Sequence, residues 1–362
     1  MRLSKQLNSS LLKVPSNYEK LDTYTLIDKI GLYSLKRSGQ PFYLPLGEKL
    51  FDKLEHALTD FASSLGFEKI HQQILIPWKL IKNRESIDDF YDQIYFIKNE
   101  EYCVLPTTED LSIEILENAL ISYKQLPIKW FSLQDVIRNI PRPEKFMKTK
   151  QIRCLSMISF SSEKDSYYIL KSFEKAFDDF LYGLRIQFQK DSNFKDKGIE
   201  YLYPCKCGEK KINNENVTSL GMVYRYVPSI QINYINKNNE KKEITILTFG
   251  IGLQRILFAI IDSNRNEKGI NFPDIIRPFE FSIIFHRGDL DLAEKCYSFL
   301  KENKKDVYFD DRNINFKDKM DYADFLGVPY KVIIGKNSKE SALEIKTSKD
   351  VTLFKSLEEL LI

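Results

Sequence analysis

Two glycines and one arginine lie close together in TFGIGLQRILF, residues 248 to 258. The apolar, β-branched residues before this segment predict a strand at 244 to 249, and the apolar residues after it recur at helical spacing. Gly250 and Gly252 would let a ligand approach the backbone closely, and Arg255 would project from the first helical turn. The pattern predicts an ATP site without a Walker loop. A glycine pair at such a junction also occurs for tight packing alone, and the segment by itself leaves both interpretations open.

A second cluster of reactive side chains is PTTED, residues 106 to 110. A strand is predicted just before it, at 102 to 105, and an apolar-periodic helix just after it. Thr107 and Asp110 have the spacing of a capping box, in which a hydroxyl and an acidic side chain satisfy free amides at a helix start. Capping and ligand binding are therefore alternative roles for this cluster.

The N-terminal part predicts a long helix followed by a strand. Residues 47 to 66 place leucine and phenylalanine on one helical face, with Gly66 at the C-cap position. Residues 74 to 76 then lead into Pro77, which cannot donate to a β-ladder and belongs at a strand end or a sheet edge. These residues alone describe an amphipathic helix packed on a sheet.

The C-terminal part alternates strands and helices after a polar linker at residues 263 to 277. The predicted strands are 279–285, 307–309 and 330–334, and the predicted helices are 292–300 and 316–326. This alternation indicates a small parallel or mixed sheet covered by helices. Arg312 follows the second strand, on the side where open α/β sheets bind ligands.

The middle of the chain, residues 190 to 216, is polar and lysine-rich, which predicts a surface excursion rather than a domain. Cys205 and Cys207 within it could form half of a zinc site. A structural zinc needs four ligands, however, and neither a histidine nor a second cysteine pair follows nearby. Zinc is therefore not the favoured interpretation.

The composition narrows the class of protein. A chain of 362 residues has room for two domains, and its net charge of +3 requires any RNA contact to be a local patch. Five scattered cysteines do not suggest a disulfide framework, and three histidines, none beside a candidate nucleophile, give little support to triad-type hydrolysis. No apolar run of about 18 residues occurs, so we expect neither a membrane span nor a secretory signal, and a cytoplasmic location.

The order of these segments resembles a class II aminoacyl-tRNA synthetase, and more narrowly a divergent, compact bacterial-type prolyl-tRNA synthetase. The resemblance runs from MRLS at the start to the C-terminus, where DVYFDDRN and ADFLGVPYKVIIGKN resemble the anticodon-binding domain. The interval between residues 152 and 248 leaves no space for an editing insertion. The resemblance implies an α+β catalytic domain, with an antiparallel sheet and flanking helices, at residues 1–270. A small α/β anticodon-binding domain would follow at residues 271–362.

The resemblance assigns the ATP-binding residues. Gly250, Gly252 and Arg255 match motif 3. Arg138 matches the motif 2 arginine that grips the α-phosphate, where negative charge builds during the reaction. Lys148 would contact the γ-phosphate. The catalytic residues implied are Arg138 and Arg255.

The resemblance also assigns the residues that contact the amino acid and the second subunit. Thr107 and Glu109 match a Thr-x-Glu loop that holds the imino group of proline, and a carboxylate suits that cation. Gln151 would be a further proline-binding residue. The helix and strand ending at Pro77 look like motif 1, which builds the dimer interface in that family.

Motif 2 departs from the family pattern. Ile140 and Gln151 stand where the family has glutamates, and Lys148 and Lys150 replace arginines. Lysine keeps the positive charge but loses the bidentate fork of arginine, a difference of about 1 kcal/mol or more in a desolvated site. We expect these changes to affect catalytic efficiency rather than the fold.

The implied function is that of a homodimeric proline–tRNA ligase, which uses ATP and Mg²⁺ to activate L-proline and charges tRNA(Pro). Arg312, Lys317 and Lys319 would contact the tRNA. The alternatives are a degenerate, non-catalytic RNA-binding or accessory protein, and an enzyme that passes the activated amino acid to another acceptor. The retained residues for the imino group of proline and for the phosphates of ATP favour the ligase, because a protein that only binds RNA or a partner does not need both.

Overall fold

The computed structural model spans residues 1–362 and describes all of them except 7–13, 15–17, 35–36, 38, 83–86, 90, 99–100, 118, 120, 145–146, 195–197, 207, 209, 213, 229 and 362. The described residues form two compact units. Unit 1 lies within Met1–Ser34, Phe42–Lys53 and Ile260–Ile362, and unit 2 lies within Leu35–Pro41 and Leu54–Ala259. The domain boundary predicted at residue 270 remains a prediction.

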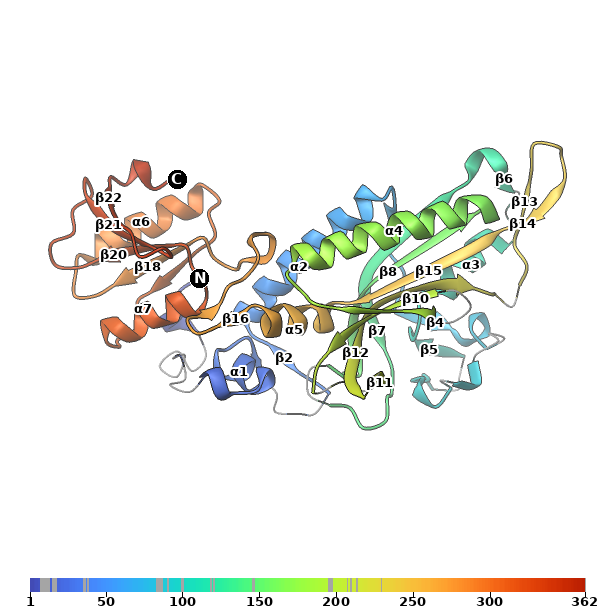
Figure 1. Cartoon of the computed structure of the whole chain (residues 1–362), viewed down its shortest axis with the longest axis horizontal. Helices are drawn as coiled ribbons and strands as arrows, with labels where there is room; N and C mark the ends of the chain where they lie inside the picture. Colours follow the sequence, from blue (N-terminus) through green and yellow to red (C-terminus); the bar gives the residue numbers. More distant parts are fainter. Residues whose placement is uncertain are drawn as a thin grey trace. The chain divides into compact units, whose positions relative to one another are not determined.

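A large, mostly antiparallel sheet forms the centre of unit 2 (Figure 1). Its strands follow the order β3 (Glu68–Lys69), β7 (Ile128–Ile137), β8 (Gln151–Ser161), β15 (Thr245–Gly252), β12 (Glu215–Tyr226), β10 (Gly198–Pro204) and β9 (Gln189–Phe194). Strand β11 (Lys210–Ile212) pairs with β12. Only β3 and β7 pair in parallel in this sheet as described. The antiparallel sheet implied by the resemblance is confirmed.

One face of this sheet is buried under two long helices, α2 (Pro45–Ser64) and α4 (Glu163–Gly183). Phe173 of α4 packs on Phe249 of β15 with ring centroids 4.6 Å apart, and Phe61 of α2 packs on Phe173 at 5.9 Å. Helix α2 agrees with the helix predicted at 47 to 66. Gly66 follows it with φ of +77°, a conformation that glycine adopts without steric cost.

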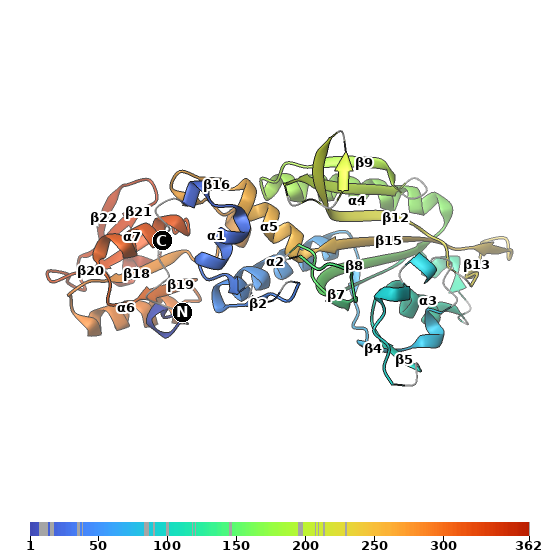
Figure 2. The same cartoon turned by 90° about the horizontal axis from the view of Figure 1, so that it is seen from below.

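The opposite face carries helix α3 (Glu109–Glu117) and the hairpin of β4 (Leu75–Pro77) and β5 (Tyr102–Val104). Figure 2 shows α3 and α4 on opposite faces of the sheet. Strand residues alternate between the faces, so every second residue of β7, β8, β12 and β15 points towards α3. The predicted strand leading into Pro77 is confirmed.

The prediction of a surface excursion at residues 190 to 216 is wrong. Strand β10 pairs with β12 and β9 inside the sheet, and its Tyr201 is fully buried against Phe177 of α4 at 4.7 Å between ring centroids. The lysines around this strand mask a short apolar run, IEYLYP. Such a run carries no periodicity that distinguishes it from a loop.

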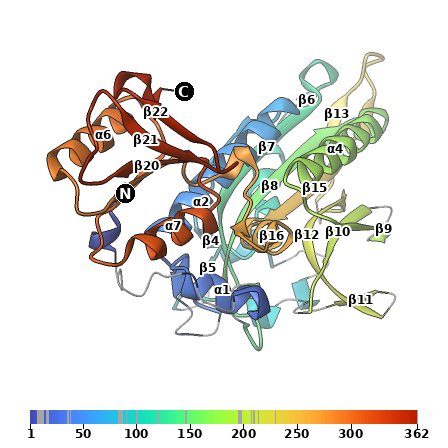
Figure 3. The same ribbon diagram turned by 60° about the vertical axis from the view of Figure 1, so that its left-hand side comes forward.

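Unit 1 contains a five-stranded sheet in the order β19 (Val307–Asp310), β18 (Phe281–Phe285), β20 (Tyr330–Ile334), β21 (Leu343–Thr347) and β22 (Thr352–Lys355). The first three strands are parallel and the last two pair antiparallel. Helices α6 (Leu290–Glu302) and α7 (Phe316–Phe325) cover opposite faces (Figure 3). All five predicted elements are present, and β21 and β22 add to them.

Several short elements complete the described chain. They are α1 (Thr23–Lys29), β1 (Tyr33–Ser34), β2 (Phe42–Tyr43), β6 (Ile121–Ser122), β13 (Asn233–Ile235), β14 (Lys241–Glu243), β16 (Arg265–Asn266) and β17 (Gly269–Ile270). Across the described residues, no helix combines the length and the apolar character needed to cross a membrane.

Candidate active site

The glycine pair lies where β15 ends and helix α5 (Leu253–Ser263) begins, as predicted. A Cβ atom at Gly250 would meet nothing closer than Met222 at 3.9 Å, and one at Gly252 nothing closer than its neighbour Arg255 at 3.8 Å. Both are ordinary van der Waals separations, so tight packing does not require glycine at either position. The missing side chains instead leave a bare stretch of backbone on the face of the sheet that α3 covers.

Arg255 lies in the first turn of α5 and reaches across two other elements. Its Nε donates to the carbonyl of Met147 at 3.3 Å, and its Nη1 donates to the carbonyl of Ser219 on β12 at 3.1 Å. Met147 precedes Lys148, so these bonds bring the arginine beside the loop that joins β7 and β8.

Arg138 directly follows β7 and is anchored at the loop before α3. Its Nε donates to the carbonyl of Pro106 at 2.7 Å, and its backbone amide donates to the carbonyl of Lys150 at 2.8 Å. Pro106 precedes Thr107. The structure therefore brings Arg138 to the loop that carries Thr107 and Glu109, although 32 residues separate Arg138 from Pro106 in the sequence.

Several charged side chains of this site affect the pKa of Cys154 on β8. Burial raises the pKa of its thiol to about 11, while the positive charges of Arg138 and Arg255 oppose that rise and the negative charges of Asp135 and Glu109 add to it. In the sheet, Cys154 pairs with Gly252. Arg138, Arg255 and Glu109 are therefore all near enough to this thiol for their charges to act on it.

Glu109 is held by donors from three elements. Its Oε2 accepts from the Thr107 hydroxyl and from the Thr108 amide, the latter at 3.2 Å. Its Oε1 accepts from the hydroxyls of Tyr224 on β12 and Thr248 on β15, at 3.4 and 3.3 Å. The Thr107 hydroxyl thus bonds to Glu109 in this cluster. Tyr224 and Thr248 were not assigned a role from sequence, because alternation along a strand does not tell which helix lies over it.

The neighbouring Asp110 has a separate partner. Its carboxylate accepts from the hydroxyl of Tyr226 at 2.9 Å, and helix α3 begins at Glu109. The capping-box interpretation paired Thr107 with Asp110. The Thr107 hydroxyl bonds to Glu109 and the Asp110 carboxylate bonds to Tyr226, and the capping box stays a prediction.

The loop after Arg138 places its two lysines differently. Lys148 is half-buried, and its backbone closes a hairpin with Glu144 through bonds of 2.9 and 3.1 Å. The ammonium of Lys150 instead donates to Asn139 at 2.9 Å and to the Tyr95 hydroxyl at 3.1 Å. Lys150 therefore braces the base of the loop beside Ile140.

Gln151 is not brought to Thr107 and Glu109. Its amide donates to Asp135 at 2.8 Å, and Asp135 also lies 3.6 Å from Arg153, whose Nε bonds to Glu55 of α2 at 2.6 Å. These contacts put Gln151 on the face of the sheet that α2 covers. Glu109 instead bonds to Tyr224 and Thr248, which point to the opposite face, beneath α3. Successive residues of a strand point to opposite faces of the sheet, so a shift of one position changes the face. The resemblance alone did not show to which face Gln151 points.

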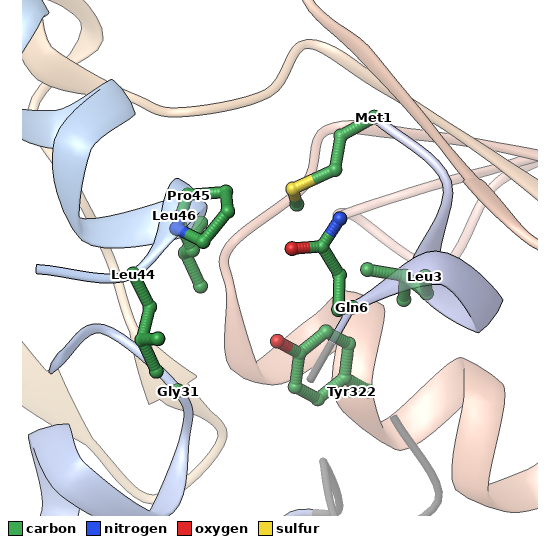
Figure 4. A pocket seen from close by; sticks show the side chains of 8 residues that line it. All are labelled: Met1, Leu3, Gln6, Gly31, Leu44, Pro45, Leu46 and Tyr322. Carbon is green, nitrogen blue, oxygen red and sulfur yellow. The ribbon is translucent and has the colours of Figure 1, made fainter. Parts of the chain in front are cut away.

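Two small cavities occur in the described chain. One, in unit 2, is lined by residues that include Gln72, Thr108, Ser132 and Ser156, and has room for about one water molecule. The other, in unit 1, is lined mainly by apolar side chains and Tyr322 and is similarly small (Figure 4). Neither is large enough to hold a nucleotide.

The three cations predicted to contact tRNA differ sharply in exposure. Arg312 is 4% exposed and bonds to Asp310 through Nε at 2.8 Å and Nη2 at 2.6 Å. Lys319 is 2% exposed, and its ammonium donates to the carbonyls of Phe285 and Asp310. Lys317 is exposed. Two of the three cations therefore hold the loop after β19 from inside the domain.

No metal site is apparent among the described residues, where no three His, Cys, Asp or Glu side chains gather suitably. Cys205 is half-buried, and Cys207 lies outside the described residues.

Family models match the chain in two places. The model of the tRNA synthetase class II core domain (G, H, P, S and T) matches residues 93–264, and that of an anticodon binding domain matches residues 282–353. The first match contains every residue assigned to ATP, and the second covers most of the five-stranded sheet of unit 1.

Curated relatives match nearly the whole chain. A proline–tRNA ligase of Sulfurimonas denitrificans is 22% identical, and the match covers 98% of this chain and 97% of the relative. One from Ehrlichia ruminantium is 25% identical over 95% and 94% of the two chains.

Solved structures of low identity share the fold. The prolyl-tRNA synthetase of Giardia lamblia in complex with prolyl-adenylate superposes with a TM-score of 0.78 at 18% identity, covering 98% of this chain and 78% of that one. The enzyme of Cryptosporidium parvum complexed with L-proline and AMP gives 0.76 at 14% identity, covering 98% and 76%. The chain therefore contains a class II tRNA synthetase core domain followed by an anticodon-binding domain, and it shares its fold with solved prolyl-tRNA synthetases.

Proposed function

We propose that this synthetase is a proline–tRNA ligase, which activates L-proline with ATP to prolyl-adenylate and transfers the prolyl group to tRNA(Pro). The observation that carries the proposal is that Arg138 bonds to the loop that holds the Glu109 carboxylate, while Thr248, which also bonds to Glu109, lies on the strand that leads through Gly250 and Gly252 into the helix of Arg255. Proline brings a cationic imino group and ATP brings anionic phosphates, so a carboxylate and two arginines match the pair of substrates. The nearly full-length matches to proline–tRNA ligases support the same assignment.

In the first step, a carboxylate oxygen of proline attacks the α-phosphorus of ATP and pyrophosphate leaves. Thr107 and Glu109 would hold the imino group, while Arg138 and Arg255 stabilise the charge that develops on the α-phosphate. Lys148 would offer a further cation to the γ-phosphate.

In the second step, the terminal adenosine hydroxyl of the tRNA attacks the carbonyl carbon of prolyl-adenylate and AMP leaves. No covalent protein nucleophile is needed. The rate then depends on positioning and on cations already aimed at the phosphates.

Mg²⁺ fits this site as a companion of the nucleotide. The described residues offer no cage of three carboxylate, histidine or cysteine ligands, and Mg²⁺ commonly binds through substrate phosphates with few protein ligands. The ion would neutralise phosphate charge when bound, while the arginines supply the protein's share.

We also propose a cytoplasmic homodimer that joins through the surface around Pro77. Beside this residue, Ile74, Leu75 and Tyr102 are 47%, 53% and 44% exposed. Large exposed apolar side chains that cluster in this way mark interaction surfaces.

For tRNA contact, we propose that Lys317 meets RNA directly. Arg312 and Lys319 would act by holding the loop that presents it, because their charged groups bond to Asp310 and to backbone carbonyls.

The proposal is tested by proline-dependent exchange of labelled pyrophosphate into ATP. We expect exchange with proline alone, reduced at least about 100-fold in Arg138→Ala and in Arg255→Ala. Lys175→Ala is the matched control, since Lys175 is an exposed cation on α4 across the sheet. No exchange with any amino acid, from a folded protein that binds tRNA, would favour the non-catalytic alternative. Exchange without transfer to tRNA would favour a different acceptor.

A further inference from the structure

We infer that Tyr224 and Thr248 are positioning residues that orient the Glu109 carboxylate for the imino group of proline. The inference rests on the proposed function and deepens it. Neither side chain belongs to the residues assigned to proline or ATP above. Both hydroxyls converge on the same oxygen, Oε1 of Glu109, at 3.4 and 3.3 Å.

The sheet itself produces this convergence. Tyr224 of β12 and Thr248 of β15 are directly paired across the two strands, so their side chains leave the same face side by side. Phe249, which follows Thr248, and Val223, which precedes Tyr224, are directly paired and completely buried on the other face. Alternation therefore forces both hydroxyls towards α3 while the core holds the strands in register.

The other oxygen of Glu109 is held independently. Oε2 accepts from the Thr107 hydroxyl and the Thr108 amide, both on the loop that leads into α3. The carboxylate is thus tied at one oxygen to its own loop and at the other to the sheet. A flexible glutamate side chain held at both ends loses little further rotamer freedom on binding a cation, so the affinity for that cation rises.

The chemistry suits a small cationic amine. Tyrosine and threonine hydroxyls donate to the carboxylate and keep lone pairs of their own, so they can stay bonded to Oε1 or turn to accept from a substrate N–H. Thr248 is two residues from Gly250, whose missing side chain leaves space on the same face. We therefore expect the two hydroxyls to act on proline binding and not on ATP binding.

A purely structural role would predict something different. Tyr226, two residues after Tyr224, makes the equivalent bond to Asp110 at 2.9 Å, and it too stitches the start of α3 to β12. If these tyrosines only fasten the helix, removing either hydroxyl should have similar consequences. Tyr226→Phe is therefore a matched control for Tyr224→Phe.

The test uses the full chain and measures KM for proline and for ATP in pyrophosphate exchange. Four variants are compared, and their folding is checked by thermal melting: Tyr224→Phe, Thr248→Val, Thr248→Ser and Tyr226→Phe. We expect Tyr224→Phe and Thr248→Val to raise the KM for proline about three- to tenfold, with the KM for ATP nearly unchanged. Thr248→Ser keeps the hydroxyl and should restore the KM for proline. Tyr226→Phe should leave it unchanged.

Two failures are distinguishable. If the native protein shows no exchange with proline, the proposed function fails and this inference fails with it. If the native protein exchanges but Tyr224→Phe and Tyr226→Phe have the same KM for proline, the tyrosines only fasten the helix and the inference alone is overturned. Equal rises in the KM for ATP and for proline would also overturn it.

Discussion

The pKa of the Cys154 thiol is set by its burial and by the charged side chains that lie near it. Its thiol lies on β8 among two arginines and two carboxylates, yet burial outweighs them and raises its pKa to about 11. Because the thiolate is the reactive form, a raised pKa makes this cysteine inert at neutral pH. The two arginines do not activate it.

We predict that Cys154 resists alkylation in the native protein. Iodoacetamide should label it slowly at pH 7.5, because little thiolate is present, and faster as the pH rises towards 11. Mass spectrometry of tryptic peptides after timed quenching measures the rate. Labelling at pH 7.5 as fast as that of a free cysteine would contradict the burial of this thiol.

Arg312 and Lys317 make a second contrast at the residue scale, since both are cations in the loop and helix after β19. We predict that Arg312→Ala lowers the free energy of unfolding by about 3 to 5 kcal/mol, because it leaves the buried Asp310 carboxylate unpaired. Lys317→Ala should leave stability nearly unchanged and weaken tRNA binding. Urea unfolding and filter binding separate the two. A stable Arg312→Ala protein would argue against the buried pair.

At the scale of the elements, ion pairs connect the first half of α2, which belongs to unit 1, to the residue that precedes β19. Lys49 and Lys53 of α2 both bond to Asp306, which directly precedes β19. Burial by itself would raise the pKa of Asp306, but the hydrogen bonds and charges of the two lysines outweigh it, so the pKa falls below 3.8. A carboxyl with a lowered pKa stabilises the fold above its ordinary pKa, and that contribution is lost as the pH falls through the lowered value.

We therefore predict that Asp306→Asn lowers the free energy of unfolding by about 1 to 2 kcal/mol at pH 7. The difference from the native chain should shrink as the pH falls below about 4, because the carboxyl then takes up a proton in the unfolded chain before it does so in the folded one. Urea unfolding at a series of pH values measures this. A difference that stays constant down to pH 3 would mean that packing, and not charge, ties α2 to Asp306.

At the scale of the whole molecule, the exposed apolar side chains near Pro77 predict self-association. We expect the native chain to be a dimer in light scattering, and Leu75→Asp to shift it towards monomer, because a charge on an apolar contact must be desolvated. Phe354→Asp is the control, since Phe354 is 69% exposed and belongs to β22 of unit 1, not to the β4–β5 hairpin. A native monomer, or equal association of both variants, would remove the Pro77 surface from consideration.

Local sequence patterns were enough to predict the strongly periodic elements and the motifs that lie between them. The helix before Gly66, the strand into Pro77, the glycine turn into α5 and the alternating strands and helices after residue 279 all appear as predicted. Local patterning suffices there, because spacing along the chain sets which face is apolar. The polar surroundings of β10 hid a buried strand for the same reason, since its short apolar run has no period to read.

Which side chains come into contact could be seen only once the strands were placed next to one another in the folded chain. Strand pairing and parity put Tyr224 and Thr248 on Glu109 and turned Gln151 towards Asp135. None of these contacts follows from spacing along the chain, because each joins a residue to a face or a neighbour set by strand register. A shift of one residue in that register would move every such side chain to the other face of the sheet.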